Sequence, residues 1–190
     1  VNAGVKVVGL DGFPGQFLVS FMENGEYTKK SFGAIIVALE AQSSYDAKKY
    51  NRIELGERIL SLSQFIKKDN DYSRQKVTFV LGQADRDSIS SYATALSQAI
   101  ALKEKDADVS ILYYDMKVSA DHLEQDYELA RARGVNFLKY EGDLQILKTD
   151  VAATVQYSEP FLEETEQVKL VSDYLVLPED YVAHPGTADL

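Results

Sequence analysis

The residues of this chain that could do chemistry follow a short apolar run near its middle. Residues 77–81 (VTFVL) are mostly β-branched or aromatic, a pattern typical of a strand buried on both faces, and Gly82 ends the run. A polar loop over residues 83–87 follows, and Ser88 or Ser90 could cap the helix after it. In an α/β domain a ligand phosphate binds at such a turn, because the helix N-terminus presents backbone N–H groups.

This turn and the end of the next strand supply the candidate cofactor-binding residues. They are Gly82, Gln83, Asp85, Arg86, Ser88 and Asp115. A dinucleotide site needs several glycines so that backbone N–H groups can approach the pyrophosphate, whereas this loop has one glycine. Asp85 and Asp87 would repel a phosphate, and Arg86 could help to bind it. A purely structural turn is the default alternative.

Asp115 follows an apolar run over residues 109–114, which predicts a second strand. An acid at the end of this strand binds the ribose in dinucleotide-binding folds, although it comes about 20 residues after the turn there and about 30 here. Pairing with Lys117 or a capping role is the alternative for Asp115. Three tyrosines near strand ends, Tyr113, Tyr114 and Tyr140, could line a ligand pocket or simply pack.

No catalytic residue and no metal site are assigned. Four acidic residues gather in one turn, Glu159, Glu163, Glu164 and Glu166, where they could bind a hard cation or lie solvated. His122 and His184 are far apart in the sequence, and we expect a solvated or capping role for each.

The amino-terminal block, residues 1–40, predicts strands rather than helices. Residues 16–22 alternate between apolar and polar side chains, and Asn24-Gly25 is a strong signal for a tight hairpin. The apolar run over residues 32–39 (FGAIIVAL) predicts a buried strand. We interpret this block as a β-meander.

Residues 41–75 predict a linker that contains one short helix. Residues 41–52 are polar and rich in tyrosine, which indicates an exposed loop. Residues 58–68 (RILSLSQFIKK) carry apolar side chains at helical spacing, with Ser61 or Ser63 as the N-cap.

Residues 76–177 alternate strand and helix, which predicts an α/β, Rossmann-like unit with a parallel sheet and flanking helices. The second helix is expected over residues 123–133, with Asp121 as N-cap and Gly134 as its stop. The expected strands after the central one cover residues 109–114, 135–139, 144–148, 151–157 and 168–177. Residues 178–190 are expected to form a tail on the surface.

Composition limits the function further. The chain has 190 residues, 45% of them hydrophobic, a formal net charge of −10 and no cysteine. Nucleic-acid binding needs clustered Lys and Arg, which are lacking, and no apolar segment is long enough to span a membrane. Disulfides, thiolate catalysis and cysteine-ligated iron–sulfur clusters are excluded for this chain. We expect a cytoplasmic protein and, because the chain starts at Val1 without a signal peptide, an excised domain.

Several stretches, taken in order, resemble a known family. They are GFPGQF at residues 12–17, GAIIVA at 33–38, ILSLSQF at 59–65, ILYYDMK at 111–117, YELARARGVNF at 127–137 and DYLVL at 173–177. Together they resemble the central region of the flavin-carrying and iron–sulfur-carrying polypeptide of heterodisulfide reductase and its relatives. The cysteines of that family, which ligate an iron–sulfur cluster, have no counterpart between Gln83 and Tyr92, where Arg86 matches the family's arginine.

The resemblance implies a thioredoxin-reductase-like fold for FAD and NAD(P) binding, with residues 1–40 as the remnant of a FAD-binding domain. It implies an oxidoreductase active in electron transfer, with FAD in the full-length parent, NAD(P)H left open, and no cofactor assigned to this chain alone. This chain would contribute part of a nucleotide pocket and a contact surface for partner redox subunits or the rest of its own chain. Homo-oligomerisation stays open, and we expect no activity from the chain alone. The alternative is a non-catalytic interaction or scaffold module that has lost cofactor binding.

Overall fold

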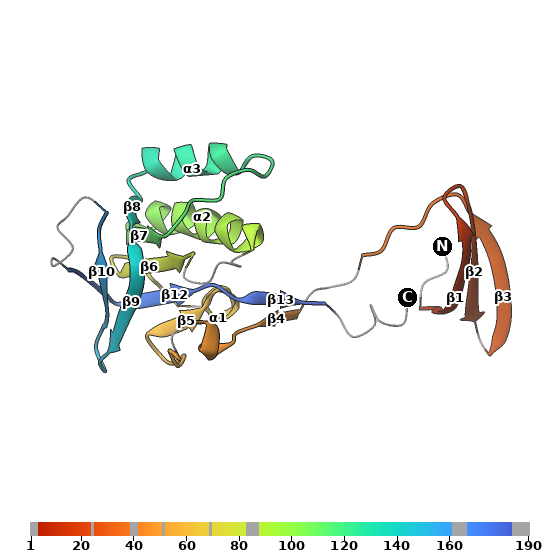
Figure 1. Ribbon diagram of the computed structural model, residues 1–190, viewed down its shortest axis with the longest axis horizontal. Coiled ribbons are helices and arrows are strands. Elements are labelled where there is room, and N and C mark those ends of the chain that lie inside the picture. The colour runs from red at the N-terminus through yellow and green to blue at the C-terminus, as the bar shows by residue number, and fades with distance from the viewer. Residues whose placement is uncertain are drawn as a thin grey trace. The chain divides into compact units, whose positions relative to one another are not determined.

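The computed structural model describes residues 4–23, 25–38, 42–50, 52–68, 70–82, 88–160 and 167–183. The chain forms two compact units (Figure 1). The larger one is Ser43–Tyr181, and the smaller one combines Val1–Gln42 with Val182–Leu190. The chain therefore crosses between the units twice.

The smaller unit is built on a three-stranded antiparallel sheet. Its strands, in spatial order, are β1 Lys6–Phe13, β2 Gln16–Glu23 and β3 Glu26–Phe32. The central strand buries Val19 and Phe21, and the Lys30 ammonium lies 5.4 Å from the centre of the Phe21 ring. Glu23 pairs with Glu26 across the tight turn, and Gly25 has a φ of +83°. The predicted meander and its hairpin are confirmed.

The strand predicted over residues 32–39 is wrong beyond Phe32. Residues 33–38 belong to no strand, and the side chain of Ile36 is 91% exposed. Val37 is 61% exposed. Apolar composition is a signal for burial, but none of the described strands pairs with residues 33–38.

The larger unit is organised around a five-stranded parallel sheet, which confirms the α/β class. Its strands, in spatial order, are β5 Ile59–Ser61, β12 Tyr174–Leu177, β6 Lys76–Leu81, β7 Asp108–Tyr113 and β8 Asn136–Lys139. All neighbouring strands pair in parallel. The central strand β6 is fully covered, because Val77, Phe79 and Val80 all have no exposed surface.

Three helices cover one face of this sheet. They are α1 Leu62–Lys67, α2 Ile89–Glu104 and α3 Leu123–Ala132. Figure 1 shows α2 and α3 side by side along the sheet. Alternate residues of β6, such as Phe79, pack with the apolar face of α2, on which Tyr92 and Leu96 are fully buried. None of the described helices is long and apolar enough to cross a membrane.

The opposite face is covered by a second, antiparallel sheet. Its strands are β9 Glu141–Lys148, β10 Ala153–Ser158 and β11 Val168–Ser172, with β10 in the middle. Val80 of β6 and Leu175 of β12 pack against Val155 of β10 in this second core. The strands expected over residues 144–148 and 151–157 are present as β9 and β10, but they pair antiparallel and do not extend the parallel sheet predicted for residues 76–177.

The strand predicted over residues 168–177 is two strands in different sheets. Asp173 separates β11 from β12: its backbone N–H donates to the Lys76 carbonyl, and its carboxylate accepts from the Lys76 N–H, both at 2.8 Å. At these reciprocal bonds the chain leaves the antiparallel sheet and enters the parallel sheet. Apolar periodicity does not reveal this change of partner.

Residues 41–52 and the start of the tail are also more ordered than predicted. The segment contains β4 Gln42–Ser44 and the 3-10 helix η1 Ala47–Tyr50, and the Tyr50 ring is buried and stacked on Tyr45 at 5.1 Å. Strand β13, Asp180–Val182, pairs with β4. The exposed loop predicted over residues 41–52 is therefore wrong at the buried Tyr50, whereas Tyr181 and Val182 of β13 lie on the surface.

The helix boundaries confirm most of the predicted caps. Ser61 caps α1 in a capping box with Gln64, although the preceding Ile59 and Leu60 form β5 and not the first helical turn. Gly134 follows α3 with a φ of +81°, as expected of a helix stop. Asp121 is not the N-cap of α3: His122 takes that position in a left-handed conformation, without a side-chain cap bond.

Candidate functional site

The larger unit reverses its strand order beside β6. The chain runs from β6 through β7 to β8 on one side of the sheet, and then returns by way of β9–β11 to β12 on the other side of β6. In open α/β sheets, ligands bind outside the carboxyl ends of the strands at this point of reversal. The carboxyl end of β6, Leu81 followed by Gly82, is therefore where a ligand site is expected on topological grounds.

Gly82 occupies a position that only glycine can take without strain. Its φ is +81°, and a Cβ added there would lie 2.9 Å from the Tyr114 Cβ and 3.2 Å from the Tyr114 backbone N. The Tyr114 N–H donates to the Leu81 carbonyl at 3.1 Å, which fixes this close approach. The ends of β6 and β7 are thus packed backbone against backbone.

Ser88 caps α2, the helix that follows. Its Oγ accepts from the Ser91 N–H at 3.2 Å, whereas Ser90, the alternative, lies exposed within the first turn. The 16-residue helix α2 carries no acidic side chain in its first turn. Its N-terminus can therefore stabilise an anion through its dipole.

Asp115, the first residue beyond Tyr114, has an exposed side chain. Its backbone carbonyl accepts a hydrogen bond from the Tyr92 hydroxyl at 2.8 Å. The structure thus brings Gly82 and Asp115 to neighbouring strand ends, with Ser88 at the start of the intervening helix. Gln83, Asp85 and Arg86 lie outside the described residues, so their role stays a prediction.

Two tyrosines at this edge were not among the candidate residues. No role is assigned to Tyr92 from the sequence, and Tyr140 is left as a residue that could line a ligand pocket or simply pack. Tyr140 is 1% exposed, its hydroxyl donates to the Leu81 carbonyl at 3.3 Å, and its ring meets Tyr114 edge to face at 5.7 Å. The Lys117 ammonium lies 5.7 Å from the centre of the Tyr92 ring. The sequence signal that could have identified Tyr92 is its hydroxyl group, which stands among apolar side chains on one face of the helix.

Glu179, just beyond β12, is a further residue that the sequence did not single out. It is 8% exposed, and its carboxylate accepts from the Ser63 backbone N–H and from the Ser63 hydroxyl, both at 2.8 Å. Ser61 of β5 pairs with Leu177 of β12, and Ser63 and Glu179 each lie two residues beyond this pair. The carboxylate ties the end of β12 to the first turn of α1.

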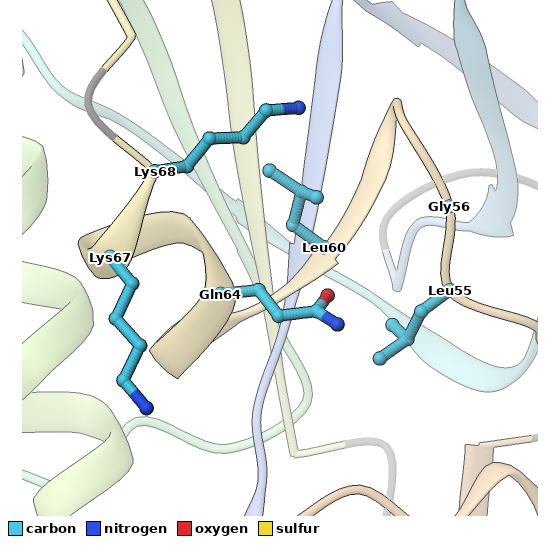
Figure 2. A pocket seen from close by; sticks show the side chains of 6 residues that line it. All are labelled: Leu55, Gly56, Leu60, Gln64, Lys67 and Lys68. Atoms are coloured by element: carbon cyan, nitrogen blue, oxygen red, sulfur yellow. The ribbon is translucent and has the colours of Figure 1, made fainter.

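A pocket of about 440 Å³ lies elsewhere, beside the edge strand β5. It is lined by Leu55, Gly56, Leu60, Gln64, Lys67 and Lys68. Figure 2 shows the Gln64 side chain directed from α1 toward Leu55 and Gly56. Because this pocket is lined by the edge strand and not by the turn after β6, it does not coincide with the predicted nucleotide site.

The acidic turn gives no support for a metal site. Glu159 is described, whereas Glu163, Glu164 and Glu166 lie outside the described residues. Within the described ranges, no three His, Asp or Glu side chains come close enough together to hold a metal ion.

Comparison with known proteins gives structural matches but no sequence match. No family model matches this sequence, and no curated protein does. An ornithine N-hydroxylase from Kutzneria sp. 744, with reduced FAD, NADP+ and L-ornithine, is similar at a TM-score of 0.45 and 14% identity, over 98% of this chain and 55% of that chain. The FAD-bound cadaverine monooxygenase of desferrioxamine biosynthesis from Erwinia amylovora is similar at 0.43 and 11% identity, over 95% and 53%.

A reduced ornithine hydroxylase from Pseudomonas aeruginosa is similar at a TM-score of 0.43 and 11% identity, over 96% of this chain and 55% of that chain. The chain thus spans about half the length of each of these structures. At these TM-scores the likeness assigns neither a fold nor a function. The sheet order and the glycine turn after β6, in contrast, are properties of this chain itself.

Proposed function

We propose that this chain is part of a FAD-dependent oxidoreductase related to the flavin-carrying polypeptide of heterodisulfide reductase, active in electron transfer. In this proposal the larger unit supplies part of a nucleotide pocket. Partner redox subunits, the rest of its own polypeptide or a second copy of the chain would contact its surface. FAD would be bound by the full-length parent, and NAD(P)H is the further candidate for the larger unit.

The turn after β6 is the single observation that supports this proposal most. Gly82 allows the chain to leave the central strand at a positive φ, and Ser88 caps a long helix that begins after the loop. This strand–turn–helix unit lies where the strand order reverses, which is the position of nucleotides in open α/β sheets. The six stretches that resemble the family add independent support from the sequence.

A non-catalytic interaction module is the second candidate. Asp85 and Asp87 in the loop, together with the absence of cysteine from the sequence, favour this alternative. Like charges close to a phosphate would weaken its binding. The two candidates differ in whether the chain binds a nucleotide at all.

Titration of the purified chain with NADPH, NADH and FAD, followed by calorimetry, distinguishes the nucleotide pocket from the interaction module. We expect saturable binding of at least one nucleotide, with a Kd raised about tenfold to 150-fold in Arg86→Ala, since a hydrogen bond to a charged group contributes about 1.5–3 kcal/mol. Arg133→Ala is the matched control, because Arg133 forms an ion pair with Glu104 at the far end of α2. Flat titrations with all three nucleotides would refute the nucleotide pocket and leave the interaction module.

A further inference from the structure

We propose that Tyr92 is a positioning residue of the nucleotide site, because its hydroxyl holds the segment after β7 in place beside the carboxyl end of β6. This inference rests on the proposed nucleotide pocket. Tyr92 belongs to the start of α2, four residues after the N-cap Ser88, and its side chain has no exposed surface. Its ring lies in the core with Leu96, so only the hydroxyl reaches the strand ends.

The Tyr92 hydroxyl binds the segment after β7 and lies close to the end of β6. It donates to the Asp115 carbonyl at 2.8 Å, after the end of β7. A Cβ placed on Gly82, after the end of β6, would lie 3.3 Å from the same oxygen. The hydroxyl that binds the Asp115 carbonyl therefore also lies beside Gly82.

A second tyrosine supports the same strand ends from the opposite face of the sheet. Tyr140 packs in the core between the two sheets, whereas Tyr92 packs in the core between the helices and the parallel sheet. The Tyr140 hydroxyl donates to the Leu81 carbonyl at 3.3 Å, and its backbone N–H donates to the Tyr113 carbonyl at 3.0 Å. The carbonyls at the ends of β6 and β7 are thus held from both faces.

Packing alone does not require the hydroxyl of Tyr92. A phenylalanine ring would fill the same space between α2 and the sheet, but it would leave the Asp115 carbonyl without this donor. Ligand-binding groups must be held within about 0.5 Å of their productive positions. Because the bond contributes about 0.5–1.5 kcal/mol, its loss should loosen the segment after β7 and weaken nucleotide binding by about threefold to tenfold.

Tyr45→Phe provides a matched control for Tyr92→Phe. The Tyr45 hydroxyl also donates to a backbone carbonyl, that of Ile53 at 2.9 Å, but in the segment before β5. Both variants lose one tyrosine hydroxyl and one bond to a carbonyl. A merely structural role for Tyr92 would lower the melting temperature in both and leave nucleotide affinity unchanged in both.

The experiment measures the Kd for NADPH, NADH and FAD by calorimetry, and amide hydrogen exchange over residues 114–118, in the full chain and both variants. We expect Tyr92→Phe alone to raise the Kd and to speed exchange over these residues. Tyr140→Phe is measured as a second variant, with the same expectation for the Leu81–Gly82 end, in case Tyr92→Phe does not fold. If Tyr92→Phe and Tyr140→Phe fold and keep the wild-type Kd values, the inference is overturned. A raised Kd in Arg86→Ala in the same series would show that the nucleotide pocket itself is present. If the wild-type chain binds none of the three nucleotides, the proposed function fails and this inference with it.

Discussion

Replacing Gly82 by alanine tests whether the strand end at β6 is as tightly packed as the structure shows. Two effects should lower the free energy of unfolding of this variant. The first is the left-handed backbone, since Gly82 has a φ of +81° and an L-residue there loses about 1–2 kcal/mol. The second is steric, because the new methyl group would lie 2.9 Å from the Tyr114 Cβ, well inside the roughly 3.5–4.0 Å at which carbon atoms attract.

The steric cost is difficult to relieve at this position. The closest atoms are the Cβ and the backbone N of Tyr114, and that N–H is bonded to the Leu81 carbonyl. Overpacking of this kind costs about 1–3 kcal/mol. We therefore expect Gly82→Ala to lower the free energy of unfolding by about 2–5 kcal/mol in total.

Gly134→Ala separates the two costs. Gly134 has the same φ of +81°, but the nearest atom to an added Cβ is the flexible Lys103 Cε at 3.8 Å. This variant should lose only the backbone cost of about 1–2 kcal/mol. The gain from restricting the unfolded chain applies to both variants and cancels in the comparison.

Urea unfolding followed by far-UV circular dichroism measures the difference, because the helices α1, α2 and α3 all lie within the larger unit. The expected result is a Gly82→Ala loss that exceeds the Gly134→Ala loss by about 1–3 kcal/mol at an unchanged denaturant slope. Equal losses in the two variants would refute the close backbone packing of β6 against β7.

Three further predictions concern a cap, a buried carboxylate and a tyrosine. Ser88→Ala should lower the free energy of unfolding by about 0.5–2 kcal/mol, and Ser90→Ala by almost nothing, in the same urea assay; the reverse order would contradict the assigned cap. Glu179→Gln should lower the free energy of unfolding by about 1–3 kcal/mol, because the Glu179 carboxylate accepts two hydrogen bonds from Ser63. An unchanged melting temperature in thermal unfolding would show that this contact does not stabilise the fold. Burial raises the pKa of Tyr45 from 10.0 to about 12, so the folded state keeps this proton after the unfolded chain has lost it. The free energy of unfolding should therefore fall between about pH 10 and pH 12. This part of the pH dependence should disappear in Tyr45→Phe, and the same pH dependence of stability in both proteins would argue against the raised pKa of Tyr45.

Much of the larger unit could be predicted from the sequence because local signals agreed with the tertiary arrangement. The buried run after Lys76, the serine caps and Gly134 each act within a few residues of the chain, so their meaning does not depend on distant partners. The parallel pairing of β6, β7 and β8 followed from the intervening helices.

The mistaken elements share a different physical cause. Residues 33–38 have the composition of a buried strand, but strand formation needs a neighbouring strand to pair with, and none of the described strands pairs with them. The apolar run over residues 168–177 changes sheets at Asp173, a decision made by hydrogen bonds to Lys76, which lies 97 residues away in the chain. Neither outcome is encoded in apolar periodicity.

By itself, the sequence determined the α/β class, the central strand and the glycine that ends it. Only the tertiary structure decided that β12 lies between β5 and β6, which puts the reversal of strand order beside Gly82. Only the tertiary structure brought the Tyr92 and Tyr140 hydroxyls to the backbone carbonyls of Asp115 and Leu81. The reason is that local sequence sets backbone preference and amphipathic pattern, whereas contacts between distant segments depend on how all the elements pack together.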